Sequence, residues 1–225
     1  MSSIHPASDP KWRRLPEERP GQILDAALSV FAEHGIASAR LEEIASRAGV
    51  SKGTIYLYFQ SKEELFREVV RLVVVPLIAR GDELLTRGTA TEQLTSYLAH
   101  QWAVFDLPDS EGWVRLVLLE LHKYPDLAQF YRTEVIERSN QVLGDIIRRG
   151  VSSGEFRPLD AACAVRMIKG VILMHVLWSG NFAQTIQLRA MPRDQVLQEI
   201  TEFVLHALCV PAVATPSPTT GAQPT

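Results

Sequence analysis

The chain has 225 residues, enough for one large domain or two small ones. Hydrophobic residues make up 46% and charged residues 22%, ordinary globular proportions that exclude a wholly disordered or collagen-like chain. The formal net charge of -3 excludes a cationic coat over the whole chain for nucleic acid or membrane, although a local basic patch remains open.

The two ends of the chain have few core-forming residues. Residues 1–18 combine three prolines with a basic cluster at positions 11–14, and residues 210–225 are rich in proline, threonine and alanine. We expect a flexible N-terminal arm and a disordered tail, because neither segment can bury enough apolar surface to offset its ordering entropy. Charge and proline precede any apolar stretch, so we expect a cytoplasmic protein with no signal peptide and no membrane partner.

The segments between the two ends have helical periodicity, and none alternates like a strand. A first helix is expected over residues 20–34. Pro20 suits the first helical position, and Gly35 suits the position after the last turn. The apolar stripe of this helix consists of Ile23, Ala26, Ala27, Val30 and Phe31.

Two short helices are expected next, over residues 41–48 and 51–58, and the connection between them has helix-turn-helix dimensions. Ala45 is small enough for the two helices to cross closely. Gly49 can adopt the left-handed conformation that the turn requires, and Ser51 is a suitable N-cap for the second helix.

The second of these helices presents a compact polar and aromatic set. Hydroxyl groups, backbone amides at a helix N-terminus and a lysine attract phosphate oxygens. A short helix that enters the major groove by its N-terminal end also brings Thr54 and Tyr56 near base edges. The set consists of Ser51, Lys52, Gly53, Thr54, Tyr56 and Tyr58.

The remaining helices follow a capping box formed by Ser61 and Glu64, and the first of them is expected to kink near Pro76. Prolines separate the later segments. The helix over 159–181 is apolar almost all round, so one side is expected to face its own domain and the other a second copy. The later helices are expected at about 91–105, 112–123, 126–150, 159–181 and 193–208. The apolar stripe of the last helix consists of Val196, Ile200, Phe203, Val204 and Ala207.

The stretch from Arg19 to about Val70 resembles the DNA-binding domain of TetR-family transcriptional regulators. The similarity lies in ILDAALSVFAEHG and in LEEIASRAGVSKGTIYLYFQSKEELF. It implies a recognition helix at 51–58 whose Lys52, Gly53, Thr54, Tyr56 and Tyr58 lie at the DNA, with Lys62 at a phosphate. It also implies that helices 159–181 and 193–208 pair with those of a second copy; the alternative is that they pack within one subunit.

One departure from the family pattern precedes the second helix, where the family usually has threonine or serine and this chain has Ala39 and Arg40. Ser38 is a candidate cap one residue early, and Arg40 is a candidate phosphate contact that replaces the usual hydroxyl. Residues 10–62 hold eight Lys/Arg and six Asp/Glu, a modest positive balance. For the cluster at 11–14, an arm along DNA and a solvated terminus both remain open.

Large side chains in the C-terminal part are candidates for a ligand pocket, although residues of this kind also form ordinary cores. Glu120 and His175 interrupt apolar helices, and a buried ionisable group needs a partner such as a ligand. A pocket with Glu120 would favour a cationic or donor-rich ligand; pairing of Glu120 with Lys123 or Arg115 is the alternative. The candidates are Trp102, Phe105, Trp113, Glu120, Tyr124, Met174, His175 and Trp178.

We expect no metal site, no cofactor and no enzymatic activity. The two cysteines, Cys163 and Cys209, have no Cys or His partner at zinc spacing, and the six histidines are scattered. There is no Gly-rich phosphate loop after a strand and no Gly-x-Ser-x-Gly motif.

The residues and the resemblance together predict an all-α protein in four parts. These are an arm (1–18), a three-helix helix-turn-helix domain (19–66), a larger helical ligand-binding and dimerisation domain (67–209) and a tail (210–225). The expected function is a homodimeric repressor that a small-molecule effector releases from a palindromic operator in double-stranded DNA. A ligand-independent DNA-binding dimer or an activator is the alternative, and a helical enzyme is the rival class.

Overall fold

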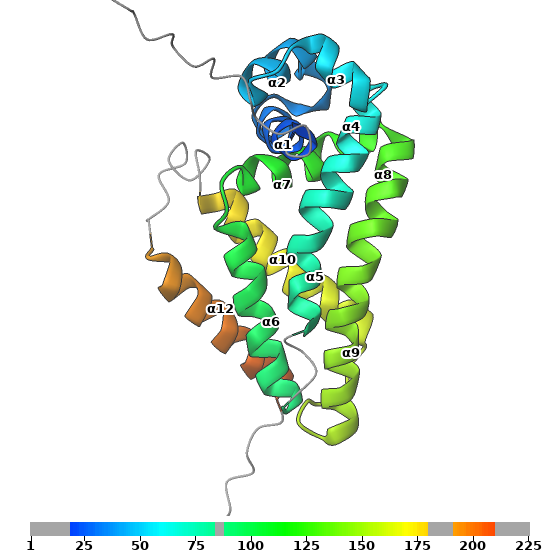
Figure 1. Cartoon of the computed structure of the whole chain (residues 1–225). Helices are drawn as coiled ribbons and strands as arrows, with labels where there is room; N and C mark the ends of the chain where they lie inside the picture. The colour runs from blue at the N-terminus through cyan, green and yellow to red at the C-terminus, as the bar shows by residue number, and fades with distance from the viewer. Residues whose placement is uncertain (1–18, 84–87, 180–190, 210–225) are drawn as a thin grey trace, which may run out of the picture.

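The computed structural model describes residues 19–83, 88–179 and 191–209, and in this part every regular element is a helix (Figure 1). The predicted all-α fold is therefore confirmed. The predicted arm over 1–18 and tail over 210–225 lie outside the described residues.

Three helices form a head at one end of the molecule (Figure 1). They are α1 (Arg19–Ser38), α2 (Leu41–Ala48) and α3 (Lys52–Tyr58). The start of α4 (Lys62–Val69), up to Phe66, also belongs to the head, because it is buried in the same core. The second and third agree with the predicted spans to within one residue. The first runs past its expected end, although Gly35, with φ of 74°, interrupts the helical backbone where the sequence placed a stop.

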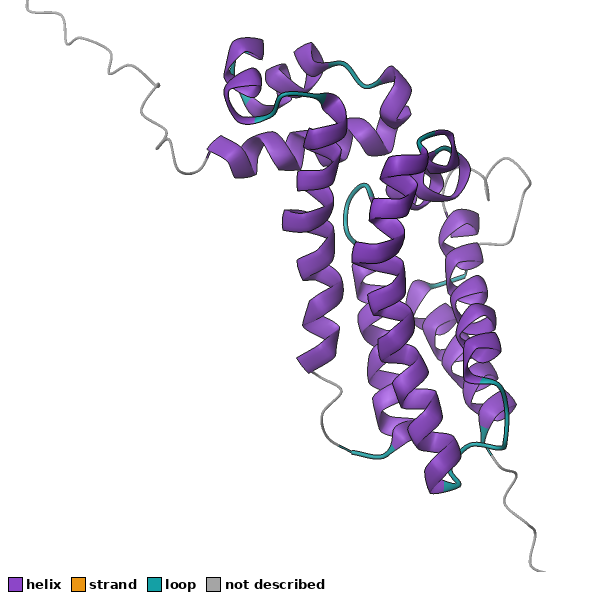
Figure 2. Cartoon of the chain, turned by 90° about the vertical axis from the view of Figure 1, so that its right-hand side faces the viewer, coloured by secondary structure: helices purple, strands orange, loops and turns teal. Residues whose placement is uncertain are grey.

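The body consists of longer helices that extend away from the head (Figure 2). The predicted kink near Pro76 takes the form of a π-helical turn just before the proline, whose ring supplies no N–H to the carbonyl four residues earlier. The elements are α4 (Lys62–Val69), η1 (Val70–Val74), α5 (Val75–Glu83), α6 (Ala90–Phe105), α7 (Ser110–Leu119), η2 (Leu121–Lys123), α8 (Pro125–Tyr131), η3 (Arg132–Glu137), α9 (Arg138–Ser153), α10 (Ala161–Ser179) and α12 (Arg193–Leu208).

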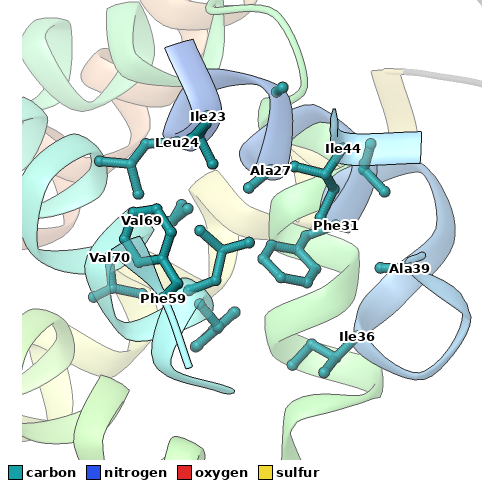
Figure 3. Close-up of a cluster of buried hydrophobic side chains, with 14 of the residues drawn as sticks. Ile23, Leu24, Ala27, Phe31, Ile36, Ala39, Ile44, Phe59, Val69 and Val70 are labelled. Carbon is teal, nitrogen blue, oxygen red and sulfur yellow. The ribbon is translucent and has the colours of Figure 1, made fainter. Parts of the chain in front are cut away.

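A first apolar core fills the head and continues into the body (Figure 3). Ile23, Phe31 and Ile44 are fully buried in the head. The same cluster includes Trp113 from α7 and Tyr131 from α8. The predicted domain boundary between residues 66 and 67 therefore crosses a continuous core, and it remains a prediction.

A second core joins α6, α9, α10 and α12. Glu155, in the loop after α9, holds the start of α6, since its carboxylate accepts hydrogen bonds from the Ala90 and Thr91 amides at 3.0 Å each. The Arg157 amide donates to the Leu208 carbonyl at 2.8 Å and fixes the end of α12.

The apolar helix α10 has two different faces. Ile168 and Ile172 are buried in the chain's own second core and Val176 is also buried, whereas Met167 is 66% exposed on the other face. By length and composition Ala161–Trp178 is apolar enough to cross a membrane, as core helices of soluble proteins also are.

The predicted stripe of α12 is also divided between two environments. Ile200 and Val204 are buried, but Phe203 is 64% exposed. The exposed faces of α10 and α12 therefore have no partner within the described chain.

Candidate nucleic-acid interface and ligand cavity

The turn between α2 and α3 fixes the start of the candidate recognition helix. Gly49 has φ of 66° and ψ of 32°, the left-handed conformation that the sequence predicted. The Ser51 hydroxyl accepts a hydrogen bond from the Thr54 amide at 3.1 Å, so Ser51 is the N-cap. Ile55 is fully buried and anchors α3 in the head core.

The outer face of α3 carries the predicted polar and aromatic set. Lys52 and Gly53 are exposed, and half of the Tyr56 surface is accessible. Leu57, which sequence reasoning missed, is 82% exposed. The exposure of Leu57 could have been predicted from the sequence, because a residue two places after a buried one, here Ile55, points to the opposite side of an α-helix. An exposed leucine on this face suits contact with a thymine methyl group.

Lys52 is paired within the head. Its ammonium donates to Glu42 Oε1 at 2.5 Å and lies 5.8 Å from the centre of the Tyr56 ring. The hydrogen bond raises the pKa of Lys52 and lowers the pKa of Glu42. A phosphate that binds Lys52 must therefore compete with an exposed carboxylate.

Arg40 and Lys62 lie together beside the turn between α1 and α2. Arg40 is exposed and is the N-cap residue of α2 without a side-chain cap, so the candidate cap at Ser38 is not formed. Lys62 Nζ donates to the carbonyls of Ala37 and Ala39 at 3.0 and 3.3 Å. The contact of Lys62 with a DNA phosphate stays a prediction. In the described structure Lys62 instead ties the start of α4 to the end of α1.

Glu33, His34 and Glu43 gather on the exposed side of α1 and α2. The Arg47 guanidinium binds both carboxylates: it donates hydrogen bonds to Glu33 at 2.5 and 2.6 Å and to Glu43 at 2.7 Å. The hydrogen bond from Arg47 lowers the pKa of Glu33, and that from His34 lowers the pKa of Glu43. The cluster therefore serves to clamp α2 onto α1.

A cavity of about 260 Å³ lies among the helices of the body, and its volume is close to the lower end of those typical for small-molecule sites. It is partly open to solvent, since its lining includes the exposed Leu107, Leu118 and Ile136. Its walls come from α1, η1, α5, α6, α7, the turn between α6 and α7, α8, η3, α9 and α10. Most of them are apolar, as with Leu77, Val104 and Leu173. Its polar lining residues, apart from Tyr131, are Gln101, Asp109, Ser110, Ser139 and Lys169.

Two of the eight predicted ligand residues, Phe105 and Trp113, line this cavity. The other six lie elsewhere, because helical periodicity alone did not show which apolar face meets a hollow. Met174 and Trp178 are exposed on the outer face of α10, where His175 forms an edge contact with the Trp178 ring.

Trp102, Glu120 and Tyr124 also lie outside the cavity lining. The Trp102 ring is buried in the second core beneath the Arg193 guanidinium. The Glu120 carboxylate lies against Gly35 of the head, and Tyr124 packs on the first core. The expectation that Glu120 would give a pocket a preference for cationic ligands is therefore not supported by its position.

Lys169 is the cavity residue whose chemistry sequence reasoning missed. Its ammonium donates to Ser139 Oγ at 2.9 Å and to Asn140 Oδ1 at 2.6 Å, both on α9. Burial lowers the pKa of Lys169 to about 8. The helical spacing of Lys169 could have indicated its inward position, because it lies one residue after Ile168 and three before Ile172 on the inner face of α10.

The cavity wall is in direct contact with the head. Trp113 stacks on Phe66 of α4 with ring centres 5.3 Å apart, and its indole N–H donates to the Tyr131 hydroxyl at 3.3 Å. Burial raises the pKa of Tyr131 to about 12. Asp109, which has φ of 67°, accepts a hydrogen bond from Ser29 of α1 at 2.5 Å.

Comparison with known proteins decides the family. Residues 23–69 match the bacterial regulatory proteins of the tetR family, and residues 86–191 match the tetracyclin repressor-like C-terminal domain. The chain is 30% identical over 166 residues to the HTH-type transcriptional repressor KstR2 of Mycolicibacterium smegmatis, covering 72% of this chain and 80% of that protein. The chain belongs to the TetR family. It is a DNA-binding transcriptional regulator from a non-enzymatic family, as the sequence predicted.

Solved structures of other transcriptional regulators share most of this fold. The Bacillus subtilis regulator FadR in complex with stearoyl-CoA is 28% identical, with a TM-score of 0.68 over 83% of this chain and 98% of that chain. A putative regulator from Saccharomonospora viridis in complex with choline is 25% identical, with a TM-score of 0.72 over 86% and 99%. The ligands of these two proteins, stearoyl-CoA and choline, differ greatly in chemistry.

Proposed function

We propose that this TetR-family regulator is a homodimeric repressor, released from a palindromic operator when a small molecule occupies the cavity of the body. The observation that carries the proposal is the shared wall between cavity and head. Trp113 and Asp109 line the cavity, and each also contacts the head region, through Phe66 and Ser29 respectively. TetR-family regulators are soluble and typically cytoplasmic, and we propose the same location for this one.

At the operator, α3 enters the major groove with its N-terminal end foremost. The groups that attract phosphate are the Ser51 hydroxyl, Lys52, the Gly53 amide, Arg40 and Lys62. Base edges are read by Thr54, Tyr56 and Tyr58, with the apolar Leu57 beside them. Changes in the reading set should alter the preferred sequence, whereas changes at Lys52 should weaken all sequences.

The dimer forms through α10 and α12. Their outer faces carry Met167, Met174 and Trp178 on α10 and Phe203 on α12, all at least 43% exposed in the single chain. Large apolar groups on adjoining surfaces typically mark an interface. A two-fold dimer presents two recognition helices to successive major grooves, roughly 34–36 Å apart, which accounts for a palindromic operator.

Ligand and DNA are linked through two conformations of the head relative to the body. A ligand shifts this equilibrium only to the extent that it binds one conformation more tightly. Occupation of the cavity moves Trp113 and Asp109, and with them α4 and α1. The helix run from α4 through η1 to α5 is the lever, because it begins in the head and ends in the cavity wall.

A two-stage experiment tests this proposal. Genomic DNA fragments are selected on the purified full chain at physiological salt, sequenced, and footprinted. We expect a short palindrome protected on both half-sites. Candidate effectors suggested by the neighbouring genes are then titrated into the complex, and release of the operator is expected for one that binds the cavity.

Two outcomes would overturn the proposal. Binding that is salt-sensitive but enriches no sequence would favour an architectural DNA-binding dimer. An effector that binds the cavity tightly and leaves operator affinity unchanged would remove the induction mechanism for that compound, because linkage requires differential affinity.

A further inference from the structure

The polar chemistry of the cavity narrows the class of molecule that it accepts, an inference that rests on the proposed function of the cavity as an effector site. Most of the lining is hydrocarbon, so the greater part of the ligand is apolar. Relatives named for stearoyl-CoA and choline differ too much for their ligands to decide the matter. The residues of this chain must therefore identify the head group.

Lys169 is the cationic residue of that lining. Among the described residues it forms no ion pair, and its two acceptors, Ser139 and Asn140, are neutral. An ammonium has three protons to donate, and these two bonds leave one for a ligand. A positive charge in an apolar surrounding is costly without a counter-charge, so an anionic ligand would gain from meeting it.

The position of the ammonium is fixed by its neighbours. Ser139 is buried, and its hydroxyl also shares a hydrogen bond with the Tyr97 hydroxyl at 3.2 Å. The Lys169 ammonium, which extends from α10, is therefore held against α9 before any ligand binds. This reduces the side-chain entropy that is lost on binding. The lowered pKa of Lys169, about 8, still leaves most of the ammonium protonated at neutral pH.

The other charged lining group, Asp109, is already engaged. Its carboxylate accepts the Ser29 hydroxyl at 2.5 Å, at the side of the cavity that faces α1. A cationic ligand group bound at Asp109 would be repelled by the positive charge of Lys169 in the same cavity. The lining therefore favours an anion at Lys169 over a cation at Asp109.

We propose that the cavity binds an apolar carboxylic acid, whose carboxylate accepts a hydrogen bond from Lys169 Nζ while its hydrocarbon part fills the space between α5, α6, α7 and α10. A thioester of the same acid offers a carbonyl oxygen to the same ammonium but brings no charge to it. The two forms are distinguished by the arms of the test.

The test measures binding to the full-length protein without DNA, by displacement of a fluorescent apolar reporter. Dodecanoate, dodecanol, dodecylamine and the coenzyme A thioester of dodecanoate are the probes. The wild-type protein should bind dodecanoate at least about tenfold more tightly than dodecanol, the usual gain from a charge-assisted hydrogen bond. Dodecanoate should also bind more tightly than the thioester.

Lys169→Met is the informative variant, since methionine keeps the length and removes the charge. It should bind dodecanoate and dodecanol equally, with dodecanol affinity unchanged. Lys169→Arg retains a charge and should retain part of the preference, which guards against misfolding in the first variant. Lys123→Met, at an exposed lysine outside the cavity, should behave like the wild type.

The inference is wrong if the preference for dodecanoate survives in Lys169→Met, if dodecylamine or the thioester binds best, or if no probe binds. These results leave the proposed function intact provided that another compound releases the operator. Conversely, dodecanoate could bind in a Lys169-dependent manner without releasing the operator. That result would overturn the proposed induction but would support the carboxylate site.

Discussion

At the residue scale, the two lysines predicted to contact phosphates, Lys52 and Lys62, are already hydrogen-bonded within the protein. Lys52 is bound to Glu42, and Lys62 is bound to backbone carbonyls at the end of α1. Affinity for DNA therefore depends on how readily a phosphate replaces these partners. A sequence predicts which residue types face DNA, but it does not show the partners that they must first give up.

The ion pair between Lys52 and Glu42 predicts that substitutions at its two residues change DNA affinity in opposite directions. Lys52→Ala should weaken binding to every DNA sequence and reduce the log–log salt slope by about 0.9, since one phosphate contact is lost. Glu42→Gln should strengthen binding, because the competing carboxylate is removed. Affinity measured over a series of salt concentrations checks both, and an unchanged slope in Lys52→Ala would contradict the phosphate role.

Glu155 gives a prediction about acid stability. The hydrogen bond from the Thr91 amide, followed by that from the Ala90 amide, lowers the pKa of Glu155 in the folded state. The folded state then binds fewer protons than the unfolded state, so this stabilisation is present above the ordinary pKa of 4.5 and disappears as pH falls through the lower, folded value. Glu155→Gln should destabilise the protein at pH 7 by roughly 1 kcal/mol, as is typical for a charge at a helix N-terminus.

Denaturant unfolding at fixed protein concentration, from pH 7 down to pH 3, checks this prediction. The difference between wild type and Glu155→Gln should narrow below the ordinary pKa. A difference that stays constant over the whole range would mean that the carboxylate charge contributes nothing to the start of α6.

At the element scale, the head and the body meet where α1 crosses α7. Gly112 of α7 lies directly against the carbonyl of Ala32, and a methyl group at position 112 would collide with that backbone oxygen. Arg115 donates to the same carbonyl at 3.3 Å. Close approach of two backbones at a glycine leaves no side chain to absorb an added group, so this crossing is sensitive to volume.

Gly112→Ala should therefore lower the free energy of unfolding by about 1–3 kcal/mol, through overpacking at the crossing. Gly21→Ala is the matched control, since nothing lies within 4 Å of the added methyl group there. The control should be neutral or stabilising by up to about 1 kcal/mol, because alanine favours a helix over glycine. Equal stabilisation in both variants would show that α1 and α7 do not meet as closely as described.

The sequence predicted most elements because their start and stop signals are local. The capping serines at 51 and 61 and the left-handed Gly49 lie where hydrogen bonds within four residues decide the backbone. The π-helical turn over Val70–Val74 was expected only as a kink near Pro76, since proline disturbs the preceding turn without specifying how. The single predicted helix over 126–150 contains a second such turn, which no local signal marked.

At the scale of the whole molecule, the single chain is incomplete along α10 and α12. The buried halves of these helices form the second core, and the exposed halves carry large apolar side chains. Exposed apolar surface of this kind is typically covered by a partner. The proposed dimer therefore completes the burial that the sequence pattern of α10 implied.

Phe203→Glu should dissociate the proposed dimer, because it places a charge at an apolar interface and removes an aromatic contact worth about 2–4 kcal/mol. Sedimentation analysis should show monomers at concentrations where the wild type is dimeric, and operator affinity should fall with it. Leu72→Glu, at a 60% exposed leucine in η1, is the control and should remain dimeric. A dimer that persists in Phe203→Glu would move the interface away from α12.

The all-α fold, the caps and the helix-turn-helix motif could be predicted from the amino-acid sequence, because they depend on interactions between residues close together in the chain. The predicted DNA-binding residues of α3 follow from the same local geometry, whereas Lys62 meets the end of α1 through contacts with residues 23 and 25 positions earlier in the chain. Which apolar faces line a cavity could not be predicted in this way, since it depends on how helices distant in the chain pack together. Lys169 and Asp109 therefore came into view as cavity residues only when α10 and α7 were placed beside α9 and α1.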